Sequence, residues 1–299
     1  MKCFALVTAG LGNIVETTPM LEALESVVDE LDIGIQGNWP GIESLLPYHY
    51  VSVYEDKYDV LVGSWWARHN PFLRMEKQKG KKVLLPRLNV IEFSEIECNV
   101  DVARQLGFTG ETPAPRLQIV GESPIKEDYI VLAPGFQKLT NYTNWQCKSW
   151  PYWKELAEML KDCGHKLAFV GTKDECEEWH KDVVDYDLCG KTDLVTMAAT
   201  MRKAVGVVGC DNGPCHVADA YGVPTVALFG PGSTVKNTYH KAKIMFAPTD
   251  AVPCRPCQFD MGRMSNCKDN LCMKLIKPKQ VYKVFTNEIS NRKSKLVAV

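Results

Sequence analysis

Strand-like and helix-like segments alternate along almost the whole chain, and this alternation limits the possible folds more than any other feature. Residues 3–9 (CFALVTA) form a continuous apolar run, which is typical of a parallel strand buried on both faces. Residues 14–31 then carry apolar side chains at helical spacing. Because parallel strands are usually joined by helical crossovers, the pattern predicts an α/β fold with parallel sheets covered on both faces.

The alternation occurs in two series, separated by residues 107–128, a segment of Gly, Pro and charge that is typical of an interdomain linker. In the first series we expect strands at 33–36, 50–54, 58–64 and 83–86, and a helix over 94–106 with Ser94 as its N-cap. In the second we expect strands at 129–134, 166–171, 186–189, 205–210 and 224–229, and helices at 151–163, 173–183, 193–204, 214–221 and 278–289. We therefore predict a Rossmann-like domain at 1–122, a second at 123–280, and a terminal helix with a loose tail at 281–299.

Composition excludes some classes of protein. The formal net charge of −1 gives no global attraction to nucleic acid or to an anionic membrane. No apolar run approaches the roughly 18 residues of a membrane span, and the opening residues are interpreted as the first strand of a mature cytoplasmic protein. Several of the 12 cysteines stand alone in apolar segments, for example Cys3, Cys163, Cys189 and Cys210. We interpret these as reduced core residues, which favours a reducing compartment.

Residues 209–231 (GCDNGPCHVADAYGVPTVALFGP) combine a strand end with a helix start. Asp211 or Asn212 can cap the helix, and Pro214 suits its first turn. The free N–H groups and the helix dipole then form an anion site suited to a diphosphate, and Gly213 allows close approach of the phosphate. His216, one turn along, can donate to phosphate or ribose. An ordinary capped turn with a core histidine is the alternative interpretation.

This segment resembles the donor-site motif of the ADP-heptose:lipopolysaccharide heptosyltransferases, glycosyltransferase family nine. Residues 10–24 (GLGNIVETTPMLEAL), 133–157 with KSWP at 148–151, 169–175 (FVGTKDE) and 189–194 (CGKTDL) resemble other family motifs in the family's order. The resemblance implies the GT-B fold, two Rossmann-like domains facing across a cleft. It also implies an inverting glycosyl transfer from a nucleotide-diphospho-sugar.

The resemblance implies roles for individual residues. Lys148 would neutralise the leaving phosphate, with Asn144 at a phosphate-contacting position. Glu175 would accept from the nucleotide ribose, and Thr192 would lie near the base. Asn212 and Gly213 would offer backbone N–H groups to the donor, while Asp211 and His216 would order the turn.

Position 13 departs from the family pattern, because the family has Asp there as the proposed general base and this chain has Asn13. An amide cannot act as a base near neutral pH. Three interpretations stay open: Asn13 orients the acceptor while Glu16 acts as base, the acceptor hydroxyl needs little help, or the protein is catalytically weak.

Four cysteines are grouped in the loop 252–274. Cys254, Cys257, Cys267 and Cys272 give the spacing C-x2-C-x9-C-x4-C, which suits a closed tetrahedral zinc or iron site. The alternative is four free or disulfide-paired cysteines. We expect a structural zinc, or iron, and no requirement for a catalytic metal.

The first domain would bind the acceptor. Trp65 and Trp66 follow a predicted strand and could stack on a sugar or a base, and Arg68 could hold an anionic group. A basic run follows at Arg74, Lys77, Lys79, Lys81 and Lys82, which is either a solvated loop or a phosphate contact.

The main hypothesis is an inverting glycosyltransferase that moves a heptose or related sugar from an ADP-linked donor (UDP and GDP are the other candidates) to a glycan or glycolipid such as a lipopolysaccharide core. A phage-type enzyme that glycosylates modified DNA bases is the first alternative. A non-catalytic nucleotide-sugar-binding protein is an alternative of another class, and a sugar-nucleotide epimerase is disfavoured by the matched motifs.

Overall fold

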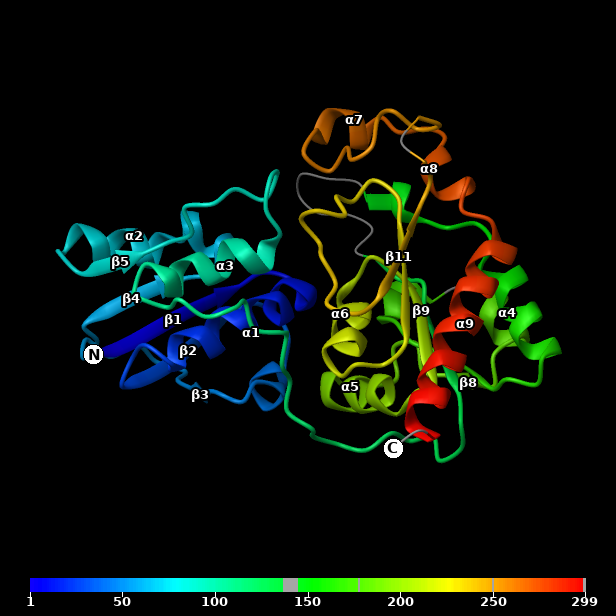
Figure 1. Cartoon of the computed structure of the whole chain (residues 1–299), viewed down its shortest axis with the longest axis horizontal. Helices are drawn as coiled ribbons and strands as arrows, with labels where there is room; N and C mark the ends of the chain where they lie inside the picture. Colours follow the sequence, from blue (N-terminus) through cyan, green and yellow to red (C-terminus); the bar gives the residue numbers. More distant parts are fainter. Residues whose placement is uncertain (137–144, 177, 249, 298–299) are drawn as a thin grey trace. The chain divides into compact units, whose positions relative to one another are not determined.

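The computed structural model describes residues 1–136, 145–176, 178–248 and 250–297. The chain divides into two compact units, Met1–Val120 and Gly121–Val299 (Figure 1). Each unit contains one sheet, and every described strand pair is parallel. The predicted α/β class with two parallel sheets is confirmed.

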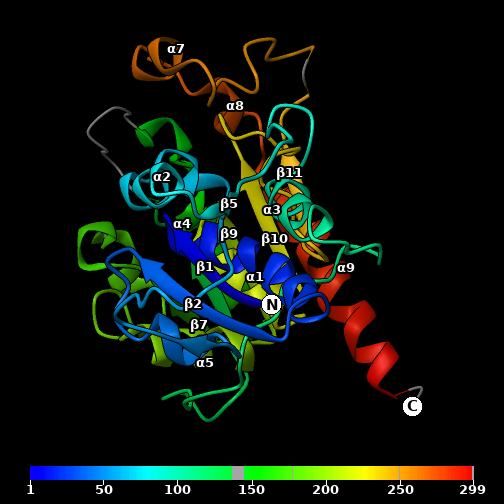
Figure 2. The ribbon, with the colours of Figure 1, turned by 90° about the vertical axis from the view of Figure 1, so that its left-hand side faces the viewer.

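The first unit has a five-stranded sheet in the order β3-β2-β1-β4-β5. Its strands are β1 (Lys2–Thr8), β2 (Glu30–Gln36), β3 (His49–Tyr50), β4 (Val60–Gly63) and β5 (Lys82–Leu84). Its helices are α1 (Leu11–Glu25), η1 (Ile42–Leu45), η2 (Trp65–His69), α2 (Pro71–Gln78) and α3 (Glu95–Arg104). Figure 2 shows β1 and β2 running side by side, in the register that pairs Lys2 with Glu30 and Thr8 with Gln36.

The apolar run of β1 explains why this strand is central. Its residues from Cys3 to Val7 are all buried, because the strand has a neighbour on each side and helices over its faces. Helices α1 and α3 pack on each other. Ser94 caps α3 as predicted, its Oγ accepting from the Glu97 N–H at 3.1 Å. This packing brings the first turns of α1 and α3 together.

The second unit has a six-stranded sheet in the order β11-β10-β9-β6-β7-β8. Its strands are β6 (Ile130–Ala133), β7 (Leu167–Phe169), β8 (Tyr186–Asp187), β9 (Gly206–Cys210), β10 (Thr225–Phe229) and β11 (Lys243–Phe246). Its helices are η3 (Trp145–Lys148), α4 (Trp153–Asp162), η4 (Lys173–Glu175), η5 (Glu178–Asp182), α5 (Leu194–Lys203), α6 (Gly213–Ala220), α7 (Met261–Ser265), α8 (Leu271–Lys274) and α9 (Pro278–Val297).

Helices cover both faces of this second sheet. Helices α4 and α9 pack together on one face, and α5 and α6 pack together on the other (Figure 1). The core includes Trp150 and Trp153, whose rings meet edge to face with centroids 4.9 Å apart. The Trp150 indole N–H donates to the Ile276 carbonyl at 2.8 Å, which fastens the segment after Lys148 to the segment before α9.

Three sequence expectations about elements are wrong. The helix expected over 14–31 ends at Glu25, because its last residues enter β2. The helix expected over 173–183 is replaced by η4 and η5, since Cys176 between them has extended backbone (φ −64°, ψ 132°). The tail expected to be loose continues α9 to Val297.

Within the described residues, no helix combines the length and the apolar character needed to cross a membrane.

Candidate functional site

The start of α6 is held against the end of the neighbouring strand β6. Asn212 is its N-cap, and its Oδ1 accepts from the Cys215 N–H at 3.1 Å. The Asn212 Nδ2 donates to the carbonyls of Ala133 and Gly135, both at 2.8 Å. One side chain thus joins the carboxyl ends of β9 and β6, where ligands bind in open parallel sheets. The first N–H groups of α6 lie at this edge and present a positive helix end.

Asp211 precedes this cap and is buried in an ion pair. The Lys148 ammonium donates to the Asp211 Oδ2 at 3.0 Å and to its carbonyl oxygen at 2.8 Å. Asn237 donates to the Asp211 Oδ2 at 2.7 Å. Burial alone would raise the pKa of the Asp211 carboxyl, but the Lys148 ammonium and His216 hold this pKa well below its usual range. The carboxylate therefore stays ionised and fixes the position of Lys148.

His216 lies on the same carboxylate. Its Nε2 is 3.8 Å from the Asp211 Oδ1, and its ring stacks on Tyr239 with centroids 4.1 Å apart and planes 13° from parallel. The Tyr239 hydroxyl reaches the Asp211 Oδ1 at 3.4 Å. The imidazole is buried and stays close to the carboxylate that precedes α6; its role in ordering this turn remains a prediction.

Glu175 lies over the backbone that follows β6. A Cβ placed on Gly135 would come within 2.4 Å of the Glu175 carboxyl carbon, so a larger residue there would displace this carboxylate. The Glu175 Oε2 accepts from the backbone N–H of Thr172, the N-cap of η4, at 2.7 Å. The structure thereby brings Glu175, Gly135 and Asn212 to adjacent strand ends.

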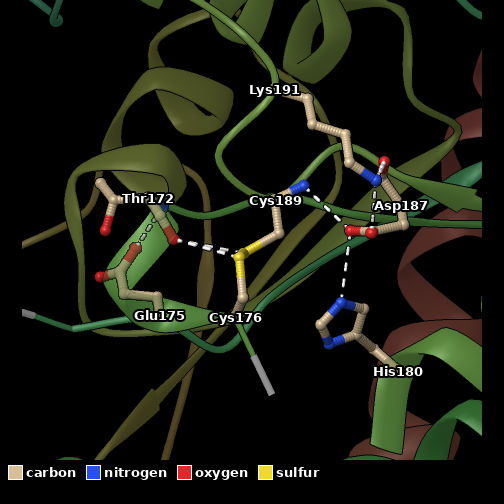
Figure 3. The surroundings of a disulfide bond; sticks show 7 residues. All are labelled: Thr172, Glu175, Cys176, His180, Asp187, Cys189 and Lys191. Carbon is tan, nitrogen blue, oxygen red and sulfur yellow. Dashed lines mark hydrogen bonds and ion pairs between the residues drawn. A yellow bond between two sulfur atoms is a disulfide. The ribbon is translucent and has the colours of Figure 1, made fainter. Parts of the chain in front are cut away.

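The turns after β7 and β8 are joined by a disulfide. Cys176 is bonded to Cys189 with the Cα atoms 5.7 Å apart, and the Cys189 Sγ lies 3.2 Å from the Thr172 carbonyl oxygen (Figure 3). The expectation of a reduced Cys189 is therefore wrong in this structure. Thr192 is half-buried in the turn that leads to α5, next to its N-cap Asp193. Asn144 lies outside the described residues.

A second polar cluster lies in the first unit. The Asn13 Nδ2 donates to both carboxylate oxygens of Glu95 at 3.0 Å. The Trp66 indole N–H donates to the Glu95 Oε2, also at 3.0 Å. Glu95 is fully buried, whereas Trp66 is 45% exposed. Glu16, the base candidate suggested by sequence, is buried within α1 at 1% exposure.

The residues expected to bind the acceptor lie in η2, immediately after β4. The rings of Trp65 and Trp66 meet edge to face at 5.1 Å, and the Arg68 guanidinium lies 5.4 Å from the Trp65 ring centroid. Beside them is a cavity of about 410 Å³ with an apolar wall and four basic side chains, those of Arg68, His69, Arg74 and Lys77.

The residues of the basic run do not all lie in one solvated loop. Arg74 and Lys77 belong to α2 and line the cavity just described. Lys79 pairs with Glu76 at 2.7 Å, and Lys81 pairs with Asp56. Only part of the run is therefore available to an anionic ligand at this cavity.

The cysteine loop lies at one end of the second unit, around α7 and α8 (Figures 1 and 2). Cys257 and Cys272 are buried, and Cys254 and Cys267 are exposed. Cys257 packs with Met264 against Cys147, the residue before Lys148. The thiols suit a tetrahedral metal site, but among the described residues no three potential ligands lie close enough together to hold an ion.

Several residues of these clusters have no signal in the sequence. Tyr239 and Asn237 hold Asp211 from a segment after β10 that contains no motif, and Glu95 contacts Asn13 across 82 residues. Gly135 was detectable only as a glycine that follows a predicted strand. Its need for close approach depends on Glu175, which arrives from another loop.

The chain is similar to known glycosyltransferases. Residues 99–266 match the model of glycosyltransferase family 9 (heptosyltransferase). The chain is 25% identical over 236 residues to lipopolysaccharide heptosyltransferase 1 of Pseudomonas aeruginosa, a match that covers 74% of this chain and 66% of the relative. The chain thus spans slightly less than two thirds of that relative's length.

Solved structures of low sequence identity share the fold. The Escherichia coli ADP-heptose LPS heptosyltransferase II superposes with a TM-score of 0.71 at 18% identity, covering 98% of this chain and 100% of that one. The iron-containing dodecameric glycosyltransferase TibC of enterotoxigenic E. coli gives 0.71 at 16% identity, covering 97% and 77%. These matches confirm the two-domain GT-B fold. Because the family model covers more than half of its 299 residues, the chain belongs to glycosyltransferase family 9, the heptosyltransferase family.

Proposed function

We propose that the chain is an inverting glycosyltransferase that uses a nucleotide-diphospho-sugar, with ADP-heptose as the first candidate donor. The observation that carries this proposal is the buried Lys148–Asp211 pair beside the start of α6. A lysine that is held by a buried carboxylate, next to free helix N–H groups, is a preorganised site for a dianionic leaving group. Family membership and the donor named for the E. coli heptosyltransferase II support the choice of ADP-heptose.

The neighbouring loops supply the other contacts that such a donor needs. The diphosphate would lie over the Asn212–Gly213 turn, with Lys148 donating to its oxygens. Glu175 lies one strand over, above Gly135, and its carboxylate can accept from ribose hydroxyls. Thr192 and Asn144, the latter outside the described residues, stay as predicted donor contacts.

The transfer would proceed as a single displacement. The acceptor oxygen attacks the anomeric carbon while the bond from that carbon to the phosphate oxygen breaks, and the configuration at the anomeric carbon is inverted. Negative charge then grows on the leaving diphosphate, where Lys148 and the α6 N–H groups stabilise it most strongly. No metal ion is needed for this charge compensation.

The first unit offers a site for an anionic glycolipid acceptor. Its cavity combines basic side chains with an apolar wall of Leu73, Val83 and Leu85. Phosphate or carboxylate groups of a lipopolysaccharide core would pair with Arg68 and Arg74, and the exposed Trp66 could stack on a sugar. The relatives' names, which refer to lipopolysaccharide, support this acceptor class.

We also propose that the loop 252–274 holds a structural zinc or iron ion through its four cysteines. The ion would order a loop whose buried Cys257 packs beside the segment that carries Lys148, so its effect on the donor site would be indirect. The iron-containing neighbour TibC makes iron a serious candidate. Elemental analysis of anaerobically purified protein should find about one ion per chain, and Cys257→Ser should lower it. Metal-free native protein would exclude the site.

Isothermal titration calorimetry with ADP, UDP, GDP and CDP tests the donor site. We expect ADP to bind most tightly and Lys148→Ala to weaken it by at least about 30-fold, since losing one partner of a buried charge contact costs about 2–5 kcal/mol. Lys154→Ala, an exposed lysine in α4, is the matched control and should bind normally. Absence of binding by every nucleotide would refute the proposed donor site.

A further inference from the structure

A fully buried carboxylate, that of Glu95, lies beside Asn13 in the first unit. Glu95 begins α3, and its two oxygens accept from the Asn13 amide at 3.0 Å each. The Trp66 indole N–H donates to Oε2 at 3.0 Å. The donors of these three hydrogen bonds are neutral groups, and the positive start of α3 adds further stabilisation of a negative charge. The first unit thus holds a preorganised carboxylate where Asn13 alone could not accept a proton.

The residues at positions 13 and 95 depend on each other. An aspartate at position 13 would bring a second carboxylate into contact with Glu95, and two carboxylates in contact cannot both be ionised near neutral pH. An amide at position 13 removes this conflict and donates to Glu95 instead. With an amide at position 13, a negative charge at this place is carried by Glu95 of α3 alone.

The surrounding contacts keep this carboxylate in place. The Trp65 N–H donates to the Asn99 Oδ1 at 2.7 Å, and the Asn99 Nδ2 reaches the Glu16 carbonyl at 3.4 Å. Asn99 is buried, so one side chain ties η2 and α1 to α3, the helix that carries Glu95. Such fixed placement is what a catalytic group requires.

We propose that Glu95 is the general base of the transfer, a catalytic residue that receives the proton of the attacking acceptor hydroxyl; this inference rests on the proposed function. The hydroxyl would donate to Oε2 in the place of the Trp66 N–H. Trp66 can leave this position because nearly half of its surface is exposed. Displacement of this indole is required, since Glu95 has no exposed surface of its own.

The acceptor oxygen forms a bond to the anomeric carbon, and the bond from that carbon to the phosphate oxygen breaks, with its electron pair leaving on the nucleoside diphosphate. The hydroxyl proton moves to Glu95, which becomes a neutral acid, and passes to water after product release. Asn13 remains a neutral amide throughout and orients the carboxylate.

The test compares wild type, Glu95→Gln and the double variant Asn13→Asp with Glu95→Gln. ADP-heptose is the donor, and lipopolysaccharide from a heptose-less strain is the acceptor. We expect Glu95→Gln to lower kcat by at least about 100-fold, the usual contribution of a general base, with ADP affinity within twofold of wild type. Its residual rate should no longer fall on the acid side of the pH profile. The double variant restores one carboxylate at the site and should recover at least about tenfold of the rate together with the acid-side fall.

Glu97→Gln is the matched control, because it makes the same chemical change in α3 where the side chain pairs with Arg104 and Thr112 instead. Glu95→Gln with wild-type kcat and an unchanged acid limb would overturn the proposal. So would a large loss in Glu16→Gln combined with none in Glu95→Gln. If the wild-type protein binds ADP-heptose but transfers no sugar, the proposed function itself is wrong. If the wild type is active and Glu95→Gln is equally active, only the role of Glu95 is wrong.

Discussion

Replacing Lys148 by methionine should destabilise the second unit strongly. The change keeps much of the side-chain volume but removes the cation from the Asp211 carboxylate, which is only 3% exposed. Breaking a buried ion pair from one side costs about 3–5 kcal/mol. Asn237 and Tyr239 still donate to Asp211, so we expect about 3 kcal/mol, at the lower end of this range. For a unit of this size, that loss lowers the Tm by about 6–12 °C.

The loss should also depend on pH. In the wild type, the pKa of the Asp211 carboxyl is depressed. Its stabilising contribution is therefore present above the unfolded value of about 3.9 and disappears as the pH falls through the folded value. Without Lys148, mainly His216 opposes burial, which is the largest influence on the pKa of Asp211, so we expect this pKa to rise above its usual value. Acidification then protonates the Asp211 carboxyl and removes the unpaired buried charge of the variant. The difference in Tm between wild type and Lys148→Met should therefore become smaller from pH 7.5 to pH 5.

Calorimetric melting at several pH values measures both effects. The double variant Lys148→Met with Asp211→Asn, which removes both charges, should be more stable than Lys148→Met alone, because its buried carboxylate is gone. A gap in Tm below about 2 °C at neutral pH, or a gap that stays constant on acidification, would refute the account of this pair.

Three further predictions concern loops around the same site and the first unit. Gly135→Ala should push the Glu175 carboxylate from its place and weaken ADP binding about tenfold or more in calorimetry; unchanged affinity would separate Glu175 from the nucleotide. Reduction of the Cys176–Cys189 bond, which spans 13 residues, should lower the free energy of unfolding in urea by up to about 3 kcal/mol, and Cys176→Ser should remove this sensitivity to reductant. Arg74→Glu should raise KM for the anionic acceptor without changing ADP affinity, and equal effects on both would argue against the cavity as the acceptor site.

Local patterns predicted much of the second unit. The apolar runs of β6, β9 and β10 are buried on both faces and could be identified from sequence, and Asn212 was one of two candidate caps for α6 because a polar residue between a strand and a helix has few other roles. Ser94 at the start of α3 is a second example. In each case the determining contacts lie within a few residues.

The remaining features depend on contacts between distant segments. Nothing near Asn13 indicates Glu95, because the two helices meet only when α1 and α3 pack. The helical pattern over 173–183 was misleading, since Cys176 has an extended backbone and forms a disulfide with Cys189. Periodicity reports which face of a segment is apolar, and it carries no information about such long-range pairing.

Mass spectrometry of the acceptor measures whether the chain transfers a sugar from a nucleotide donor. Purified protein is incubated with ADP-heptose and heptose-less lipopolysaccharide, with Lys148→Ala in parallel. The proposed transferase activity predicts one added heptose on the acceptor, one ADP released for each transfer, an inverted anomeric configuration by NMR, and loss of the product with Lys148→Ala. Binding of ADP-heptose with no added sugar and no ADP release would contradict it and would favour a protein that only binds nucleotide sugars.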